Sequence, residues 1–289
     1  MHTIDTIGVN RLEMDIQRPS GCFVLGSPRG SGVGGGIPNL LHPITFCHHR
    51  VTNIVARIGP RTGPTNHSLL LNAHFDTVPD SPGANDDGAA VATIMDVLGV
   101  MAYSSTPLAH DLVFLFNGAE ENFLQSAQGF VTKHPWRHSI RAFINLDAAG
   151  SGGRELLFRS GPGSSWLMKE YLDAAPHPFC NSVGQDYYES GLVPSATDFL
   201  VFKDFGHLPG LDIAYIRNGW RYHTEFDTVE RIDEGAIQHA GENLLAVVKA
   251  ILKSPSMRSG GPEHGDTKWV FLDVIGLFSV YYSIETGGC

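Results

Sequence analysis

The stretch that decides the fold is Ser68-Leu69-Leu70-Leu71-Asn72-Ala73-His74-Phe75-Asp76. Its apolar first half predicts a buried strand, and His74 and Asp76, two residues apart at the carboxyl end, lie on the same face of such a strand. This geometry suits one metal ligand and one carboxylate that orients it. A histidine with ordinary hydrogen bonds beside a turn aspartate is the alternative interpretation.

A loop rich in Gly, Pro and Asn follows this strand. It reads Pro82-Gly83-Ala84-Asn85-Asp86-Asp87-Gly88 and presents Asp86 just before an Ala/Val-rich segment. That segment is predicted to be a helix packed against the strand.

Length and charge exclude several classes of protein. The chain has 289 residues and a net charge of -10, and 42% of its residues are hydrophobic. It contains no run of Lys and Arg, so we expect no nucleic-acid partner. Four cysteines without CxxC spacing argue against a structural zinc module. We expect no signal peptide in residues 1–10 and no membrane span, because no stretch of about 20 residues is apolar.

Strand and helix patterns alternate along the chain. This alternation predicts an α/β fold with a mostly parallel sheet and helices on both faces. The predicted strands are 11–17, 51–58, 68–74, 111–117, 140–146, 155–158 and 211–216, and the predicted helices are 87–103, 126–134, 164–175 and 233–252.

Acidic and imidazole side chains gather at the predicted carboxyl ends of strands, where sites form in such sheets. They are His74 with Asp76, Glu120 with Glu121, Asp147, and His223 a few residues beyond a strand. Each has an ordinary alternative, such as a solvated helix start for the Glu pair or a helix N-cap for Asp86 and Asp87. Their joint occurrence favours a metal site.

These residues supply the nitrogen and oxygen ligands that a pair of zinc ions needs. His74 and Asp147 would hold one ion, Glu121 and His223 the other, and Asp86 would bridge them. Because the adjacent residues Glu120 and Glu121 cannot both point at one atom, one can bind the ion while the other takes a proton from the attacking water. Asp76 would set the tautomer of His74.

Five motifs together resemble the co-catalytic zinc exopeptidases, the family of aminopeptidase Y and glutamate carboxypeptidase II. They are His74-Phe75-Asp76, the loop 82–88, Asn117-Gly118-Ala119-Glu120-Glu121, the segment 145–150 and Tyr222-His223-Thr224-Glu225-Phe226-Asp227-Thr228. The resemblance implies a three-layer α/β/α sandwich, two Zn²⁺ ions, a peptide substrate and Glu120 as general base. It also implies that Tyr222 stabilises the oxyanion, and that Asp198 and Asp227 have structural roles.

The resemblance extends to organisation and location. It implies a zinc metallopeptidase domain over residues 1–253, with 26–47 as an insertion or loop. Residues 254–289 resemble a shortened approach to a membrane span, so we expect membrane association only in a longer form that carries spans. Segments 116–122, 128–136 and 194–199 resemble a branch of the family in the endoplasmic reticulum, and the sequon Asn66-His67-Ser68 agrees with that location.

Two other functions remain open. A catalytically idle, truncated domain could serve as a binding scaffold on the same fold, and loss of ligands would be its mark. An acyltransferase similar to glutaminyl cyclase would use a related site with a single zinc ion. Oligomeric state and the choice between aminopeptidase and carboxypeptidase stay undecided.

Overall fold

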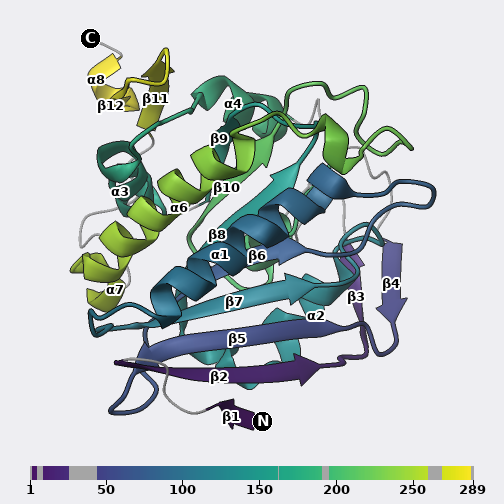
Figure 1. Cartoon of the computed structure of the whole chain (residues 1–289), viewed down its shortest axis with the longest axis vertical. Helices are drawn as coiled ribbons and strands as arrows, with labels where there is room; N and C mark the ends of the chain where they lie inside the picture. Colours follow the sequence, from purple (N-terminus) through teal and green to yellow (C-terminus); the bar gives the residue numbers. More distant parts are fainter. Residues whose placement is uncertain are drawn as a thin grey trace.

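The computed structural model describes residues 2–4, 9–25, 44–161, 163–190, 195–259 and 269–287. Its main sheet has eight strands (Figure 1) in the order β1 (His2–Ile4), β2 (Asn10–Gln17), β5 (Asn53–Pro60), β7 (Asp111–Asn117), β6 (Ser68–His74), β8 (Ile140–Ala148), β10 (Gly210–Tyr215) and β9 (Glu155–Ser160). The four strands β7, β6, β8 and β10 are mutually parallel, and antiparallel pairs flank them.

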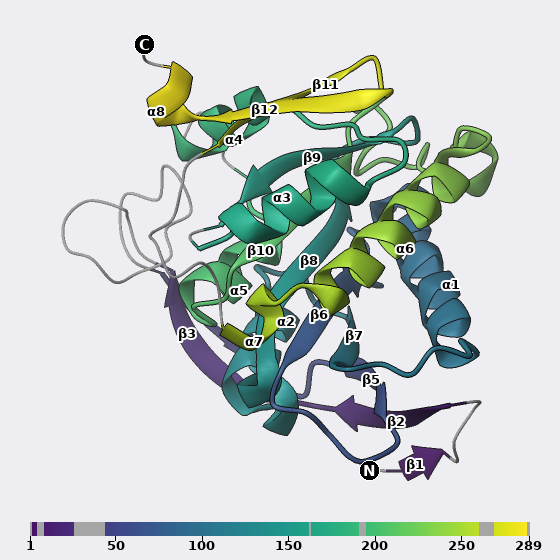
Figure 2. The ribbon, with the colours of Figure 1, turned by 90° about the vertical axis from the view of Figure 1, so that its left-hand side faces the viewer.

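The sheet is covered on both faces, as the continuous apolar strands require. Along β6, Leu69 and Leu71 belong to one hydrophobic core, whereas Leu70 belongs to the other. Helices α1 (Ala90–Ala102), α3 (Ser165–Ala174) and α6 (Ala236–Lys253) pack on the first face, and α2 (Gln125–Lys133) and α5 (Phe199–Asp204) on the second (Figures 1 and 2). The predicted three-layer α/β/α sandwich is confirmed.

Most predicted elements agree with the structure to within a few residues. The helix predicted over 87–103 begins at Ala90 as α1, three residues later than predicted. The turn η1 (Ala84–Ala89) precedes it, and Asp86 and Asp87 inside this turn have non-helical backbone angles. The side chain of Asp227 binds this backbone and holds it away from a regular helix.

A small two-stranded sheet lies apart from the main one. It pairs β3 (Gly21–Leu25) with β4 (Ile44–His48) and is closed by a disulfide between Cys22 and Cys47, which face each other in register. The loop predicted over 26–38, and most of the insertion predicted over 26–47, lie outside the described residues.

The described part of the predicted tail, 254–259 and 269–287, packs against the rest of the chain. Strands β11 (Trp269–Val274) and β12 (Phe278–Ser283) form a hairpin, between α7 (Ser256–Ser259) and α8 (Ile284–Gly287). Phe271 is fully buried, and the carboxylate of Asp273 accepts a hydrogen bond from the backbone of Cys180. A domain boundary at residue 253 stays a prediction. In the described part of the chain, no helix is both long and apolar enough to cross a membrane.

Candidate metal centre

The parallel strands bring the predicted site residues to one edge of the sheet. Strand β6 ends at His74, and Asp147 is the penultimate residue of the neighbouring strand β8. Glu120 and Glu121 follow β7, the neighbour of β6 on its other side. Because parallel strands share the direction of their carboxyl ends, these side chains meet above one edge.

A first group of possible metal ligands is buried. The Nε2 atom of His74 lies 3.2 Å from Oδ1 of Asp86 and 3.8 Å from Oδ1 of Asp147. One possible ligand atom from each of the three residues lies within 4.8 Å of the other two. These three residues are therefore close enough to bind one ion.

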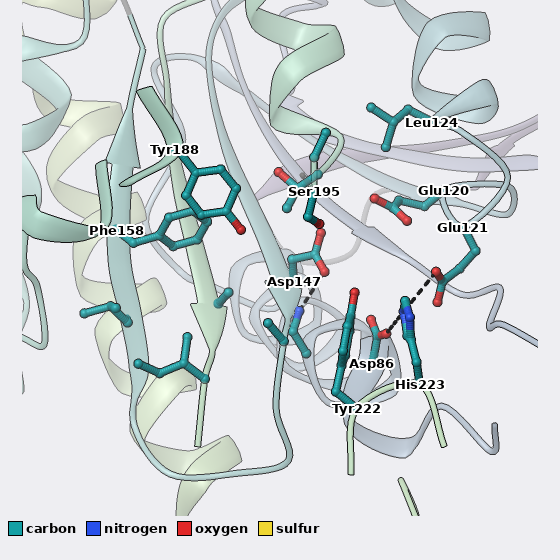
Figure 3. Close-up of a pocket in the computed structure, with 18 of the residues that line it drawn as sticks. Asp86, Glu120, Glu121, Leu124, Asp147, Phe158, Tyr188, Ser195, Tyr222 and His223 are labelled. Atoms are coloured by element: carbon teal, nitrogen blue, oxygen red, sulfur yellow. Dashed lines mark hydrogen bonds and ion pairs between the residues drawn. The ribbon is translucent and has the colours of Figure 1, made fainter. Parts of the chain in front are cut away.

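A second group uses the other oxygen of the same aspartate. The Nε2 atom of His223 lies 3.0 Å from Oδ2 of Asp86 and 3.1 Å from Oε2 of Glu121 (Figure 3). Asp86 thus turns one oxygen to each histidine, as a bridging carboxylate would. His223 has a backbone φ of 59°, in the left-handed region that is uncommon for residues other than glycine.

Asp227 controls how Asp86 is presented. Its carboxylate accepts hydrogen bonds from the backbone N–H groups of Asn85 and Asp86, at 3.1 and 3.0 Å. The side-chain amide of Asn85 donates to the carbonyl of Gly150 at 2.8 Å, which ties the turn to the loop after β8. The peptide bond between Asp86 and Asp87 is cis. Asp227 therefore has the structural position expected of it.

Asp76 contacts the backbone after β7 as well as the imidazole of His74, which was its only predicted partner. The Nδ1 atom of His74 lies 3.0 Å from the backbone carbonyl of Asp76 and 3.5 Å from its carboxylate. The carboxylate also accepts hydrogen bonds from the backbone N–H groups of Glu120 and Glu121, at 3.0 and 3.2 Å. Asp76 therefore joins the ends of β6 and β7 as well as orienting the imidazole.

Glu120 is in an environment that suits a proton acceptor. It is 8% exposed and lines the same cavity as Asp86 and Glu121. Burial raises the pKa of Glu120 well above its ordinary value, and the negative charges of Asp147 and Glu121 add to the rise. A carboxylate with a raised pKa binds a proton more readily at neutral pH.

Tyr222 lies flat against His223. The two rings are 3.6 Å apart between centroids and 21° from parallel. Burial, followed by the charges of Asp86 and Asp147, raises the pKa of the Tyr222 hydroxyl, so this group keeps its proton and can donate a hydrogen bond. Figure 3 shows Tyr222 beside Asp86 on the wall of the cavity.

The charges of this cluster fit a metal. Burial lowers the pKa of His74, but the carboxylates of Asp147, Asp76 and Asp86 raise it well above its ordinary value. Burial also raises the pKa of Asp147 to about 6, and the Oε1 atom of Glu121 is buried without a hydrogen-bond partner. Clustered carboxylates with unused oxygens are costly in a buried site unless cations compensate them. Imidazole nitrogen with carboxylate oxygen is a donor set that zinc accepts.

A polar network under the site was missed by the sequence analysis. Its side-chain hydrogen bonds run from strand to strand: Asn72 to Asn145 at 2.7 Å, and Asn145 to Asp212 at 3.0 Å. Asp198 accepts from Asn72 at 2.9 Å and from Asn117 at 2.6 Å, which gives it the structural role that was expected. The available signal was a polar residue inside each otherwise apolar strand, such as Asn72 in β6, Asn145 in β8 and Asp212 in β10.

A cavity of about 450 Å³ opens beside the two ligand groups. In Figure 3, Phe158 and Tyr188 lie at one end, and Glu120, Glu121 and Leu124 lie at the other. None of the described residues that line it is Lys or Arg. Arg217, near His223 in sequence, instead pairs with Asp233 at 3.1 Å, and Arg221 donates to the carbonyl of Arg231.

Known proteins resemble this chain over most of its length. The sequence profile of peptidase family M28 matches residues 53–248. A Caenorhabditis elegans protein assigned the name endoplasmic reticulum metallopeptidase 1-A is 58% identical over 98% of the chain. Human endoplasmic reticulum metallopeptidase 1 is 43% identical, also over 98% of the chain. The chain covers 30% of each of these two relatives. Both names agree with the predicted location, the endoplasmic reticulum, which is confirmed.

Solved structures share the fold at low sequence identity. A zinc aminopeptidase from Bacillus subtilis superposes with a TM-score of 0.55 at 20% identity, over 73% of this chain and 52% of that one. A glutaminyl cyclase from Porphyromonas gingivalis superposes with a TM-score of 0.53 at 18% identity, over 82% of this chain and 84% of that one. One fold therefore accompanies two different activities, and the site residues must distinguish them.

Proposed function

The chain belongs to peptidase family M28, and we propose from this premise that it is a zinc-dependent aminopeptidase with two metal ions. His74 and Asp147 would hold one ion, Glu121 and His223 the other, and Asp86 would bridge them. The observation that carries the proposal is that the two carboxylate oxygens of Asp86 face different histidines. Oδ1 lies 3.2 Å from Nε2 of His74, and Oδ2 lies 3.0 Å from Nε2 of His223. A single-metal site would not need this second group.

The residues of the chain support hydrolysis of a peptide bond. Zinc, when bound, lowers the pKa of water and polarises a carbonyl oxygen. Glu120 accepts a proton from the attacking water and returns it to the leaving amine. Tyr222 donates a hydrogen bond to the developing oxyanion. Asp76 positions Glu120 through its backbone N–H and so keeps the base beside the ligand groups.

The charge of the cavity favours an amino terminus over a carboxyl terminus. A carboxypeptidase needs a cation that binds the terminal carboxylate of its substrate, and the described lining residues include no Lys or Arg. Glu120, the lining carboxylate that binds no metal in this proposal, lies beside the ligand groups instead and attracts an ammonium group. The apolar end near Phe158 and Tyr188 has room for the side chain of the terminal residue.

Zinc content and cleavage of matched peptides test the proposal together. We expect two zinc ions per chain, and removal of residues from the free amino end of a peptide. Acetylation of that end should abolish cleavage, whereas amidation of the carboxyl end should not. The opposite pattern would indicate a carboxypeptidase. One zinc ion with cyclisation of an amino-terminal glutamine would indicate a cyclase, and two ions without turnover would indicate the idle scaffold.

A further inference from the structure

Phe123 lies at the mouth of the cavity, two residues after the ligand candidate Glu121. It is 52% exposed, has a backbone φ of 65° and lines the cavity together with Leu124. A large, half-exposed aromatic residue in left-handed backbone is an unfavourable arrangement that neighbouring structure must maintain. The structure contains such a neighbour.

Phe46 of strand β4 stacks on Phe123. The ring centroids are 4.3 Å apart and the planes differ by 28°. Offset stacking at this distance stabilises a ring pair beyond the burial of its area. Phe46 therefore fixes the position of the Phe123 ring, although the two residues are far apart in sequence.

The hairpin that carries Phe46 is held together by a disulfide and packs against another part of the chain. Its strands are joined by the disulfide of Cys22 and Cys47, directly beside Phe46. Phe23, which pairs with Phe46 across the strands, is 5% exposed. The centroid of its ring lies 6.0 Å from the ring centroid of Phe205. A line of aromatic rings thus runs from the α5 side of the main sheet, through the hairpin, to the rim of the cavity.

The position of Phe123 relates it to a defined part of the substrate. Phe158 and Tyr188 occupy one end of the cavity, and Glu121 and Leu124 the opposite end, with Asp86 and Asp147 between them (Figure 3). A terminal side chain at the Phe158 end places the scissile bond over the carboxylates. The residue after that bond then reaches the end where Leu124 and Phe123 lie.

We propose that Phe123, supported by Phe46, forms a binding subsite for an apolar side chain on the leaving-group side of the scissile bond. The inference rests on the proposed aminopeptidase function. The rings of Phe46 and Phe123 are apolar and uncharged. Leu or Phe in the second position of a peptide therefore buries apolar surface against the subsite. Glycine in that position gains nothing from the subsite.

The kcat/KM values of Leu-Leu-Gly and Leu-Gly-Gly test this subsite in the zinc-loaded full chain. We expect the parent protein to prefer Leu-Leu-Gly by about tenfold, the scale of one apolar contact in a specificity pocket. Phe46→Ala and Phe123→Ala should reduce this ratio several-fold, mainly through KM for Leu-Leu-Gly. Phe46→Leu, which keeps an apolar contact, should retain most of the preference.

Phe278→Ala is the matched control, because Phe278 lies on strand β12, is 54% exposed and does not line the cavity. It should leave the ratio unchanged. Equal ratios in the parent, Phe46→Ala and Phe123→Ala proteins would overturn the subsite while leaving the aminopeptidase proposal intact. Failure of the parent to cleave either peptide would overturn both.

Discussion

The carboxylate of Asp227 accepts a 3.0 Å hydrogen bond from the backbone N–H of Asp86. The bond joins the loop after β10 to the turn before α1, and it connects the two segments that supply Asp86 and His223. The candidate ligand Asp86 is therefore placed by a buried residue that belongs to neither proposed ligand group. Such supporting contacts determine how well a site binds its ion.

Replacing Asp227 should weaken zinc binding. Asp227→Ala removes the acceptor for Asn85 and Asp86, so the turn no longer holds the carboxylate of Asp86 in place. We expect zinc affinity to fall by about 10- to 100-fold, measured by competition with a fluorescent chelator. Asp233→Ala, which removes only the half-exposed partner of Arg217, is the control. Equal affinities in the two variants would show that the turn is held in another way.

Glu120→Gln should separate catalysis from metal binding. The amide keeps the size of the side chain but cannot accept the proton, so kcat should fall by about 10²- to 10⁴-fold. Zinc content should remain at the parent value. Glu234→Gln, at an exposed position before α6, provides the control for loss of one negative charge. Parent-like turnover in Glu120→Gln would assign the base to another residue.

Stability should fall in mild acid because of His134. Burial lowers the pKa of this imidazole from 6.5 to about 4, although nearby Asp15 partly opposes the shift. In the unfolded chain His134 binds a proton near pH 6.5, so the folded state loses stability as the pH falls from about 6.5 towards about 4. The loss due to His134 should reach about 2 kcal/mol at about pH 5.

Urea unfolding of the parent and of His134→Asn at about pH 7.5 and about pH 5 measures this contribution. In the parent, the backbone N–H of Trp136 donates to Nδ1 of His134 at 3.1 Å. Asparagine keeps an acceptor for this hydrogen bond. The variant should lose less stability than the parent on acidification. His138→Asn, at an exposed position, should behave like the parent. An identical pH dependence in all three proteins would contradict the assignment.

The ion pair of Arg159 and Asp212 should contribute strongly to folding. The side chain of Asp212 is fully buried and that of Arg159 is 11% exposed, and Thr197 also donates to Asp212 at 2.8 Å. Arg159→Leu leaves a buried carboxylate without its cation, so we expect the free energy of unfolding to fall by about 3–5 kcal/mol.

The exposed pair of Lys169 and Asp173 offers a comparison for Arg159. Lys169→Leu breaks an ion pair in water on the surface of α3, and the expected loss is below about 1 kcal/mol. Both variants are compared by chemical unfolding at one pH. Losses of equal size would mean that the cross-sheet network does not depend on the guanidinium of Arg159.

The strands and the candidate ligands were predictable because their signals are local. Apolar runs such as Asp111–Asn117 specify buried strands, and parallel strands must place their carboxyl ends together. The motifs around His74, Asp86 and His223 could therefore be assigned to one edge of one sheet from the sequence alone. The start of α1 was misjudged because the contact of Asp227 with the turn, which overrides local helix propensity, spans about 140 residues of sequence.

Other features depended on the tertiary structure alone. The disulfide of Cys22 with Cys47, the stacking of Phe46 on Phe123 and the network from Asn72 to Asp212 join residues whose separation in sequence carries no periodic signal. The sequence by itself determined which strands form and which side chains end at their edge, because these follow from local burial patterns. The tertiary structure decided which distant side chains hold them there, because hydrogen bonds and ring contacts depend on distances that only the folded chain defines.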